Sequence, residues 1–187
     1  MRDNYIRTMK YLLAGQTSAR LTFRLLVRED FTAWMPLFED KTAAGFLGMA
    51  DIGTPKEQCE KWFEISENRY KNDLGGMNVL IDKASNELVG QCGLLIQEVD
   101  GKKEMEIGYS ILPKHWNKGY ATEAAQKCRD YAFENNFTDS LISIVHVDNV
   151  RSEKVARKNG MTFNKKTIFK EMPVNIFRII KTDWLKK

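Results

Sequence analysis

A cluster of small residues around position 119 could bind an anion, because a helical pattern begins there directly after a strand-like stretch. The cluster lies in the segment WNKGYATEAA, residues 116–125. The first N–H groups of a helix have no partner inside the helix, and the helix macrodipole adds partial positive charge at that end. A phosphate can therefore bind there, and Gly119 and Ala121 leave room for its approach. The residues expected to contact it are Asn117, Lys118, Gly119, Tyr120, Ala121 and Thr122.

The pattern after this turn predicts a helix that lies close to a sheet. Small residues recur at helical spacing, and polar residues stand between them. The apolar positions are Ala121, Ala124, Ala125, Cys128 and Ala132. A face of such small side chains allows close packing.

The rest of the chain supplies strands on both sides of this helix. Alternating or β-rich runs predict strands over 21–27, 77–82, 88–97, 103–112, 141–147, 162–169 and 174–181. Further helices are predicted from Glu29 or Asp30, from the Thr54-Pro55 pair to about Tyr70, and over 149–159. Turns at 85–86 and 100–101 imply antiparallel hairpins. These patterns predict an α+β fold in which residues 1–187 form one domain, with 1–19 as an N-terminal extension that is ordered in part.

Three segments carry a resemblance to a known family. They are RLTFRLLVREDF (residues 20–31), EIGYSILPKHWNKGYATEA (106–124) and NVRSEKVARKNGMTF (149–163). The chain resembles the GNAT superfamily of acyl-CoA-dependent N-acetyltransferases from about Arg20 to about Ile180, and within it the RimJ/RimL branch, which acetylates protein N-terminal amines. The superfamily pattern Gln/Arg-x-x-Gly-x-Gly/Ala is kept at Gly119 and Ala121, but Trp116 stands at its first position.

The resemblance implies a mixed, mostly antiparallel central sheet with helices on both faces. It also implies acetyl-CoA as the acyl donor, with its pyrophosphate on the turn at 117–122. In such folds the strand before this turn splays from the next strand, and the freed backbone groups bind pantetheine and face the thioester carbonyl. Ser110, Ile111 and Leu112 match those positions.

An amine acceptor needs a base, since an amine with a pKa of about 8 to 10 is mostly protonated at neutral pH. The resemblance implies a carboxylate on the strand over 103–112, and Glu106 is the candidate. Glu104 lies on the same strand face, because side-chain direction has a period of two, and is the second candidate.

The resemblance also places Asn149 beside the pantetheine arm, and the same residue can serve as the N-cap of the helix, so both roles could hold together. Ser152 lies one turn on and is a second cofactor contact. Many family members have a tyrosine in this helix that protonates the leaving thiolate, and here Ala156 stands at its position. Ser152, a water molecule or departure of the free thiolate could serve instead.

Composition agrees with an ordinary globular domain. The 187 residues carry a net charge of +4, which is too small to indicate nucleic-acid binding. No apolar run approaches the roughly 20 residues that span a bilayer, so no membrane partner is expected. We expect the protein to be cytoplasmic. Cys59, Cys92 and Cys128 are far apart and are expected to be buried, with no metal site and no disulfide framework.

Two hypotheses follow. The first is an enzyme, monomeric or homodimeric, that acetylates a peptide or protein N-terminal amine or a small amino-acid-like amine by direct attack. The alternative is an acyl-CoA-binding regulatory module with weak or no catalysis. The departures from the family pattern at Trp116 and Ala156 keep this alternative open.

The chain from residue 165 onward contains seven basic residues and two acidic ones. This excess of positive charge predicts an acceptor that is not a polycation. The basic residues are Lys165, Lys166, Lys170, Arg178, Lys181, Lys186 and Lys187.

Overall fold

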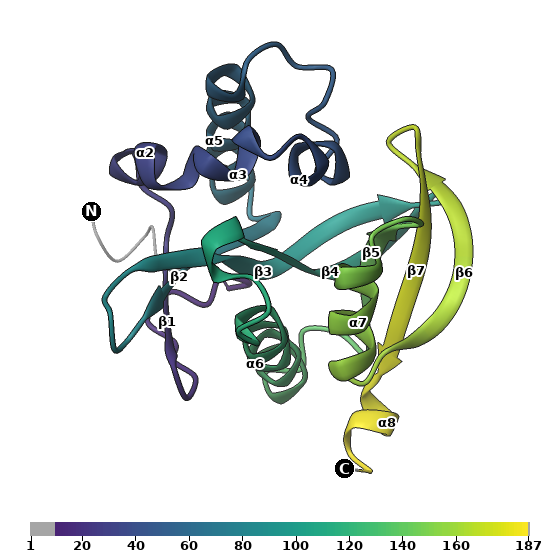
Figure 1. Cartoon of the computed structure of the whole chain (residues 1–187). Helices are drawn as coiled ribbons and strands as arrows, with labels where there is room; N and C mark the ends of the chain where they lie inside the picture. Colours follow the sequence, from purple (N-terminus) through teal and green to yellow (C-terminus); the bar gives the residue numbers. More distant parts are fainter. Residues whose placement is uncertain (1–9, 187) are drawn as a thin grey trace.

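The computed structural model describes residues 10–186, which form a seven-stranded sheet between two layers of helices (Figure 1). The strand order is β1-β2-β3-β4-β5-β7-β6, and β4–β5 is the parallel pair in an otherwise antiparallel sheet. The strands are β1 (Leu21–Arg24), β2 (Gly75–Asp82), β3 (Leu88–Val99), β4 (Lys102–Ile111), β5 (Ser140–His146), β6 (Thr162–Phe169) and β7 (Met172–Ile180). The predicted fold class is confirmed.

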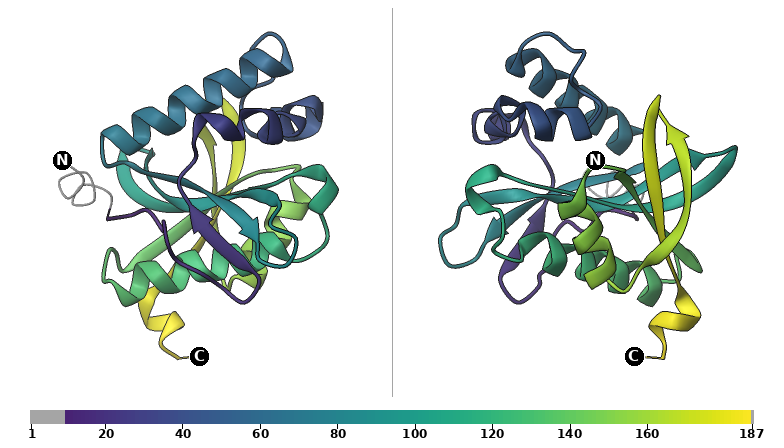
Figure 2. Two further views of the ribbon diagram at one scale, coloured as in Figure 1. Left: turned by 90° about the vertical axis from the view of Figure 1, so that its left-hand side faces the viewer. Right: turned by 45° about the vertical axis from the view of Figure 1, so that its right-hand side comes forward.

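Helices cover both faces of the sheet (Figures 1 and 2). Helices α2 to α5 lie on one face, and α6 and α7 lie on the other. The helices are η1 (Arg28–Asp30), α2 (Phe31–Trp34), α3 (Pro36–Glu39), α4 (Lys41–Phe46), α5 (Pro55–Lys71), η2 (Pro113–His115), α6 (Tyr120–Glu134), α7 (Val150–Lys158) and α8 (Lys181–Trp184). Within residues 10–186, none of them is both long and apolar enough to cross a membrane.

Helix α6 packs against β3 and β4 through the small-residue face predicted from the sequence. Its side chains Ala124, Ala125, Cys128 and Ala132 are completely buried. Short side chains let the helix backbone approach the sheet closely, so the N-terminus of α6 is held firmly beside the end of β4. A second core lies on the other face, where Trp34, Phe38 and Phe63 are buried under β2 and β3.

Local signals explain where the elements begin and end. Thr54 caps α5 by accepting a hydrogen bond from the Glu57 amide, and Pro55 occupies the first turn, as predicted. The single helix predicted after Glu29 is instead four short ones, because Pro36 starts a new helix and the Asp40 side chain caps another. Strand β1 stops at Arg24, three residues earlier than predicted.

The described part of the N-terminal extension packs into the domain. Leu12 and Leu13 are buried, and the Leu13 N–H donates to Asn78 Oδ1 at 3.0 Å. Thr17 forms a bridge to Thr22 at the start of β1. Residues 10–19 therefore belong to the folded unit; residues 1–9 of the predicted extension lie outside the described residues.

All three cysteines are buried and free, as predicted. Burial raises the pKa of Cys59 to about 12 and raises that of Cys92 well above its ordinary value. The Sγ atoms of Cys92 and Cys128 lie 3.5 Å apart between β3 and α6. They pack there as small apolar groups.

The contact of β2 with β3 gives a stability prediction. A Cβ at Gly93 would lie 1.9 Å from the backbone oxygen of Gly76, so Gly93→Ala must push the two strands apart. We expect the free energy of unfolding to fall by about 2 kcal/mol in urea titrations, the usual cost of overpacking. Gly45→Ala in α4 is the control, since a Cβ there meets nothing within 4 Å and should be neutral or slightly stabilising. Equal stability of the Gly93 variant and the wild type would contradict this prediction.

Candidate functional site

The centre of the sheet opens between β4 and β5. These strands pair at two positions, Met105 with Leu141 and Glu106 with Ile142. Beyond them β4 continues to Ile111 and β5 to His146 without further pairing. We call the gap between residues 107–111 and 143–146 the β4–β5 opening. An opening of this kind exposes backbone groups that a regular sheet would bond.

The register of β4 decides which of those groups face the opening. The Leu112 N–H donates to Val89 O on β3 at 3.0 Å, and the β3–β4 register runs on without a bulge. In an antiparallel pair the direction of the backbone groups alternates. Residues 106, 108, 110 and 112 therefore point their N–H and C=O groups toward β3, whereas residues 107, 109 and 111 point theirs toward the opening.

This alternation corrects part of the prediction for the backbone donors. Ile111 faces the opening, as predicted. The Leu112 amide is bonded to β3, and the Ser110 amide is directed there as well, so neither is free to bind a ligand in the opening. The Tyr109 amide, which was not predicted from the sequence, faces the opening instead.

Three side-chain contacts line the opening on its α7 side. The Ser143 hydroxyl donates to Ile107 O at 2.9 Å. The Tyr109 phenol donates to Ser152 O at 2.8 Å, and the Ser152 hydroxyl donates to the phenol oxygen at 3.1 Å. Tyr109 thus reaches from β4 to the first turn of α7.

Beyond the end of β4, the turn before α6 has the geometry of an anion site. Asn117 and Gly119 adopt positive φ angles of 61° and 83°, and residues 117–119 are exposed. Gly119 is the N-cap of α6, and no side chain within residues 10–186 caps this helix. The amides of Tyr120, Ala121 and Thr122 therefore point toward the turn with no side-chain acceptor of the described residues on that end.

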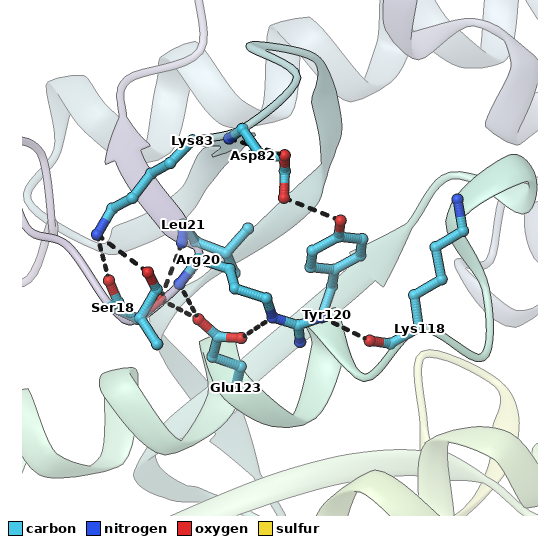
Figure 3. Close-up of polar contacts among 10 residues, drawn as sticks. Ser18, Arg20, Leu21, Asp82, Lys83, Lys118, Tyr120 and Glu123 are labelled. Atoms are coloured by element: carbon cyan, nitrogen blue, oxygen red, sulfur yellow. Dashed lines mark hydrogen bonds and ion pairs between the residues drawn. The ribbon is translucent and has the colours of Figure 1, made fainter.

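Arg20 fixes this turn from a distant part of the chain (Figure 3). Its Nη1 donates to Lys118 O at 2.9 Å, and its Nε donates to Glu123 Oε2 at 2.7 Å. Its guanidinium also lies over the ring of Tyr120, 4.6 Å from the centroid. Glu123 would otherwise place an unpaired negative charge in the first turn of α6. Arg20 and the Ser18 hydroxyl, which bonds Glu123 Oε1 at 2.7 Å, neutralise and occupy that carboxylate.

Arg20 could not be identified as a site residue from the sequence. Its contacts lie about a hundred residues away along the chain, and no local pattern reports them. The neighbouring Tyr120 adds a second link, because its hydroxyl donates to Asp82 Oδ2 at 2.9 Å on β2 (Figure 3). Hydrogen bonds from the Ser85 amide and from this hydroxyl hold the pKa of Asp82 below its ordinary value.

Trp116 bridges the mouth of the β4–β5 opening. Its indole N–H donates to Ile111 O at 2.7 Å, which uses a backbone group that faces the opening. The Arg151 guanidinium, at the start of α7, lies over the indole at 4.3 Å from the centroid. Trp116 thus ties the end of β4 to the opposite wall of the opening.

Glu106 lies where the opening narrows to its closed end. It is partly exposed, on the sheet face that α5 covers, and it accepts a hydrogen bond from Gln97 Nε2 at 2.7 Å. Burial raises the pKa of Glu106; the Gln97 bond, the charges of Arg69 and Lys170 and the Ile144 amide oppose that shift without cancelling it. A carboxylate with a raised pKa accepts a proton more readily than an ordinary one.

Glu104, the second candidate, has a structural partner. Arg178 contacts both of its oxygens, at 3.1 and 2.7 Å, and the two side chains are 17% and 23% exposed. The bidentate pair thus occupies both carboxylate oxygens of Glu104. This geometry favours Glu106 over Glu104.

Helix α7 carries the remaining predicted residues. The Asn149 side chain accepts a hydrogen bond from the Ser152 amide at 3.1 Å, so its N-cap role is confirmed. Ala156 is completely buried in the core shared with α6. The position at which the resemblance implies a tyrosine thus holds a packed methyl group with no functional chemistry.

Comparison with known proteins agrees with this geometry. A family model described as an acetyltransferase (GNAT) domain matches residues 20–162. The uncharacterised protein YkkB of Bacillus subtilis (strain 168) is 32% identical over 139 residues, which cover 74% of this chain and 78% of YkkB.

Solved structures share the fold. An acetyltransferase from Agrobacterium tumefaciens str. C58 superposes with a TM-score of 0.73 at 25% identity, covering 88% of this chain and 92% of that one. RimL, a ribosomal-protein α-N-acetyltransferase in complex with coenzyme A, superposes with a TM-score of 0.71 at 18% identity, covering 89% and 97%. At that identity the likeness to RimL concerns the fold alone.

The raised pKa of Glu106 predicts an unusual effect on stability. A carboxyl group whose pKa is raised on folding binds its proton more tightly in the folded state than in the unfolded chain. Its contribution to stability therefore falls as the pH rises through the window from its unfolded pKa to its folded one. We expect Glu106→Gln to be more stable than the wild type at pH 7, with the gain vanishing in acid, in urea titrations across pH.

Glu104→Gln is the matched control, because it removes a charge from the same strand face but breaks the pair with Arg178. Its free energy of unfolding should be lower than that of the wild type by about 1 kcal/mol at pH 7. A Glu106→Gln protein that is less stable than the wild type at neutral pH would show that the Glu106 carboxylate is a structural group.

Proposed function

The chain belongs to the GNAT family of acetyltransferases, and on that basis we propose that it transfers an acetyl group from acetyl-CoA to a primary amine. The observation that carries the proposal is the position of Glu106. It is one of the two β4 residues that pair with β5, so it lies at the closed end of the β4–β5 opening. The uncapped N-terminus of α6 lies at the other end, beyond Ile111.

The residues present suit a phosphate-bearing acyl donor. The turn at 117–122 offers backbone amides at a helix N-terminus, and Arg20 has removed the competing charge of Glu123. The opening offers the amides of Tyr109 and Ile111 along β4. When bound, acetyl-CoA supplies an activated acetyl carbonyl, and backbone N–H groups in a dry site stabilise the negative charge that develops on its oxygen.

Glu106 would remove the proton from the acceptor ammonium. Its raised pKa makes it a better proton acceptor than an exposed carboxylate, and Gln97 holds one of its oxygens in place. The free amine can then attack the carbonyl directly. This role is the one proposed for Glu106 from the sequence, and Glu104 is the weaker candidate.

The acceptor we favour is a peptide or protein α-amine or a small amino-acid-like amine. The basic residues from position 165 onward support this choice of acceptor less than expected, because several of them form ion pairs with acidic side chains. Lys165 bonds Asp100 at 2.5 Å, Arg178 bonds Glu104, and Lys186 bonds Asp183. Among these basic residues Lys170 supports the proposal most. Its positive charge lowers the pKa of Glu106, so it acts at the position where the acceptor amine would lose its proton. Placement in the RimJ/RimL branch likewise stays a prediction.

The turn at 117–122 gives a binding prediction. Gly119→Asp adds a negative charge where the pyrophosphate would bind, and its Cβ would meet Arg20 Nη2 at 3.4 Å. We expect the affinity for acetyl-CoA, measured by calorimetry, to fall by at least 10²-fold. Gly101→Asp is the matched control: Gly101 also has a positive φ, 73°, in open space at the opposite end of β4, so it adds the same charge and similar strain. Equal affinities for a folded Gly119→Asp protein and its control would refute the phosphate site.

The catalytic proposal is tested by release of free thiol from acetyl-CoA over a panel of amines and peptides. Glu106→Gln should lower kcat by roughly 10²-fold, the size expected for a lost general base, with unchanged affinity for acetyl-CoA. The deficit should shrink as the pH rises, because the amine then loses its proton unaided. If the wild type binds acetyl-CoA but acetylates no amine in the panel, the proposed acetyl transfer is wrong and the protein is better described as an acyl-CoA-binding regulatory module.

A further inference from the structure

We propose that the Tyr109 phenol donates the proton that the departing CoA thiol needs, and that Ser152 assists it. The inference rests on the proposed acetyl transfer and assigns its second proton step to a residue of β4. Tyr109 is thus a catalytic residue in this proposal, and Ser152 is a positioning residue.

The position of Tyr109 is the first argument. It belongs to the part of β4 that has left β5, so its backbone N–H faces the β4–β5 opening. Its side chain crosses to α7 and ends at Ser152. A thioester bound along this part of β4 has the phenol on the α7 side of the sheet and Glu106 on the α5 side. The two proton transfers then occur on opposite faces of the reacting carbon.

The hydrogen bonds around the phenol are the second argument. The phenol O–H donates to Ser152 O at 2.8 Å, and the phenol oxygen accepts from the Ser152 hydroxyl at 3.1 Å. The donated bond holds the ring in place. The accepted bond stabilises the negative charge that remains on the phenol oxygen after the proton has left. Ser152 therefore makes Tyr109 a better proton donor than the same buried phenol would be without this bond.

The other hydroxyl groups of the opening are less suited to this step. The Ser143 hydroxyl is bonded to Ile107 O, and that of Ser152 is directed at the phenol. An aliphatic hydroxyl is also a far weaker acid than a phenol. Ala156 contributes no proton.

Tyr109 keeps its proton at neutral pH. Burial raises its pKa, and the nearby Cys92 and Glu106 act in the same direction, while the hydrogen bond from the Ser152 hydroxyl opposes them. The donor form is therefore available throughout the neutral range. In the step itself the amine nitrogen bonds to the acetyl carbon and the C–S bond breaks with its electron pair going to sulfur. The nitrogen loses its surplus proton to solvent water, which leaves the neutral amide, and sulfur takes the phenol proton. Solvent water then returns a proton to the phenolate.

The test compares Tyr109→Phe, Ser152→Ala and the double variant in the thiol-release assay, with acetyl-CoA affinity and Tm measured alongside. We expect Tyr109→Phe to lower kcat by roughly 10²-fold with little change in acetyl-CoA affinity. Ser152→Ala should lower kcat by a smaller factor. In the Tyr109→Phe background it should lower kcat no further, because the serine acts through the phenol. A Tyr109→Phe protein with full kcat, or independent effects of the two substitutions, would overturn the assignment.

A second measurement separates catalysis from bracing of α7. 3-Fluorotyrosine placed at position 109 keeps the ring and both bonds but is a stronger acid. The alkaline limb of the kcat profile should move to lower pH; an unmoved limb overturns the proposal even if Tyr109→Phe fails to fold. A wild type that releases no thiol from acetyl-CoA would instead refute the acetyl transfer itself.

Discussion

The short parallel pairing between β4 and β5 is the constraint on which the rest of the site depends. Two paired positions hold the halves of the sheet together, and the strands then separate. Because β4 stays bonded to β3 along its whole length, separation frees one edge of β4 and leaves its shape unchanged. A rigid strand with one unbonded edge is a ready template for an extended ligand, since its N–H groups keep their spacing whether or not a ligand is present.

The two ends of this opening are maintained by different forces. At the closed end Glu106 is held by a hydrogen bond and by burial, which disfavours its charge. At the open end no side chain of residues 10–186 caps the turn before α6, and Arg20 pairs with the Glu123 carboxylate in the first turn of that helix. Both arrangements leave polar groups less satisfied than they would be in a purely structural element. Such sites favour ligand chemistry at some expense of stability.

Much of the fold could be predicted from local sequence signals. The Thr54-Pro55 start of α5, the hairpin turns and the small-residue face of α6 all depend on residues close together in the chain. The site was less predictable. Arg20 meets its partners across the whole domain, and the choice between Ser110 or Leu112 and Tyr109 as backbone donors depends on which edge of β4 pairs with β3. Neither the contacts of Arg20 nor the choice of the β4 edge that pairs with β3 can be inferred from nearby residues in the sequence.

Burial of all three cysteines makes the folded protein unreactive toward thiol reagents. Cys59, Cys92 and Cys128 are inaccessible, and the raised pKa values of Cys59 and Cys92 keep these thiols protonated, whereas disulfide exchange and alkylation require an exposed thiolate. A colorimetric thiol reagent added to the native protein should therefore give no signal from the protein's own cysteines. Any signal then comes from cleavage of a thioester or from unfolding of the chain, and the two differ in time course and in amount.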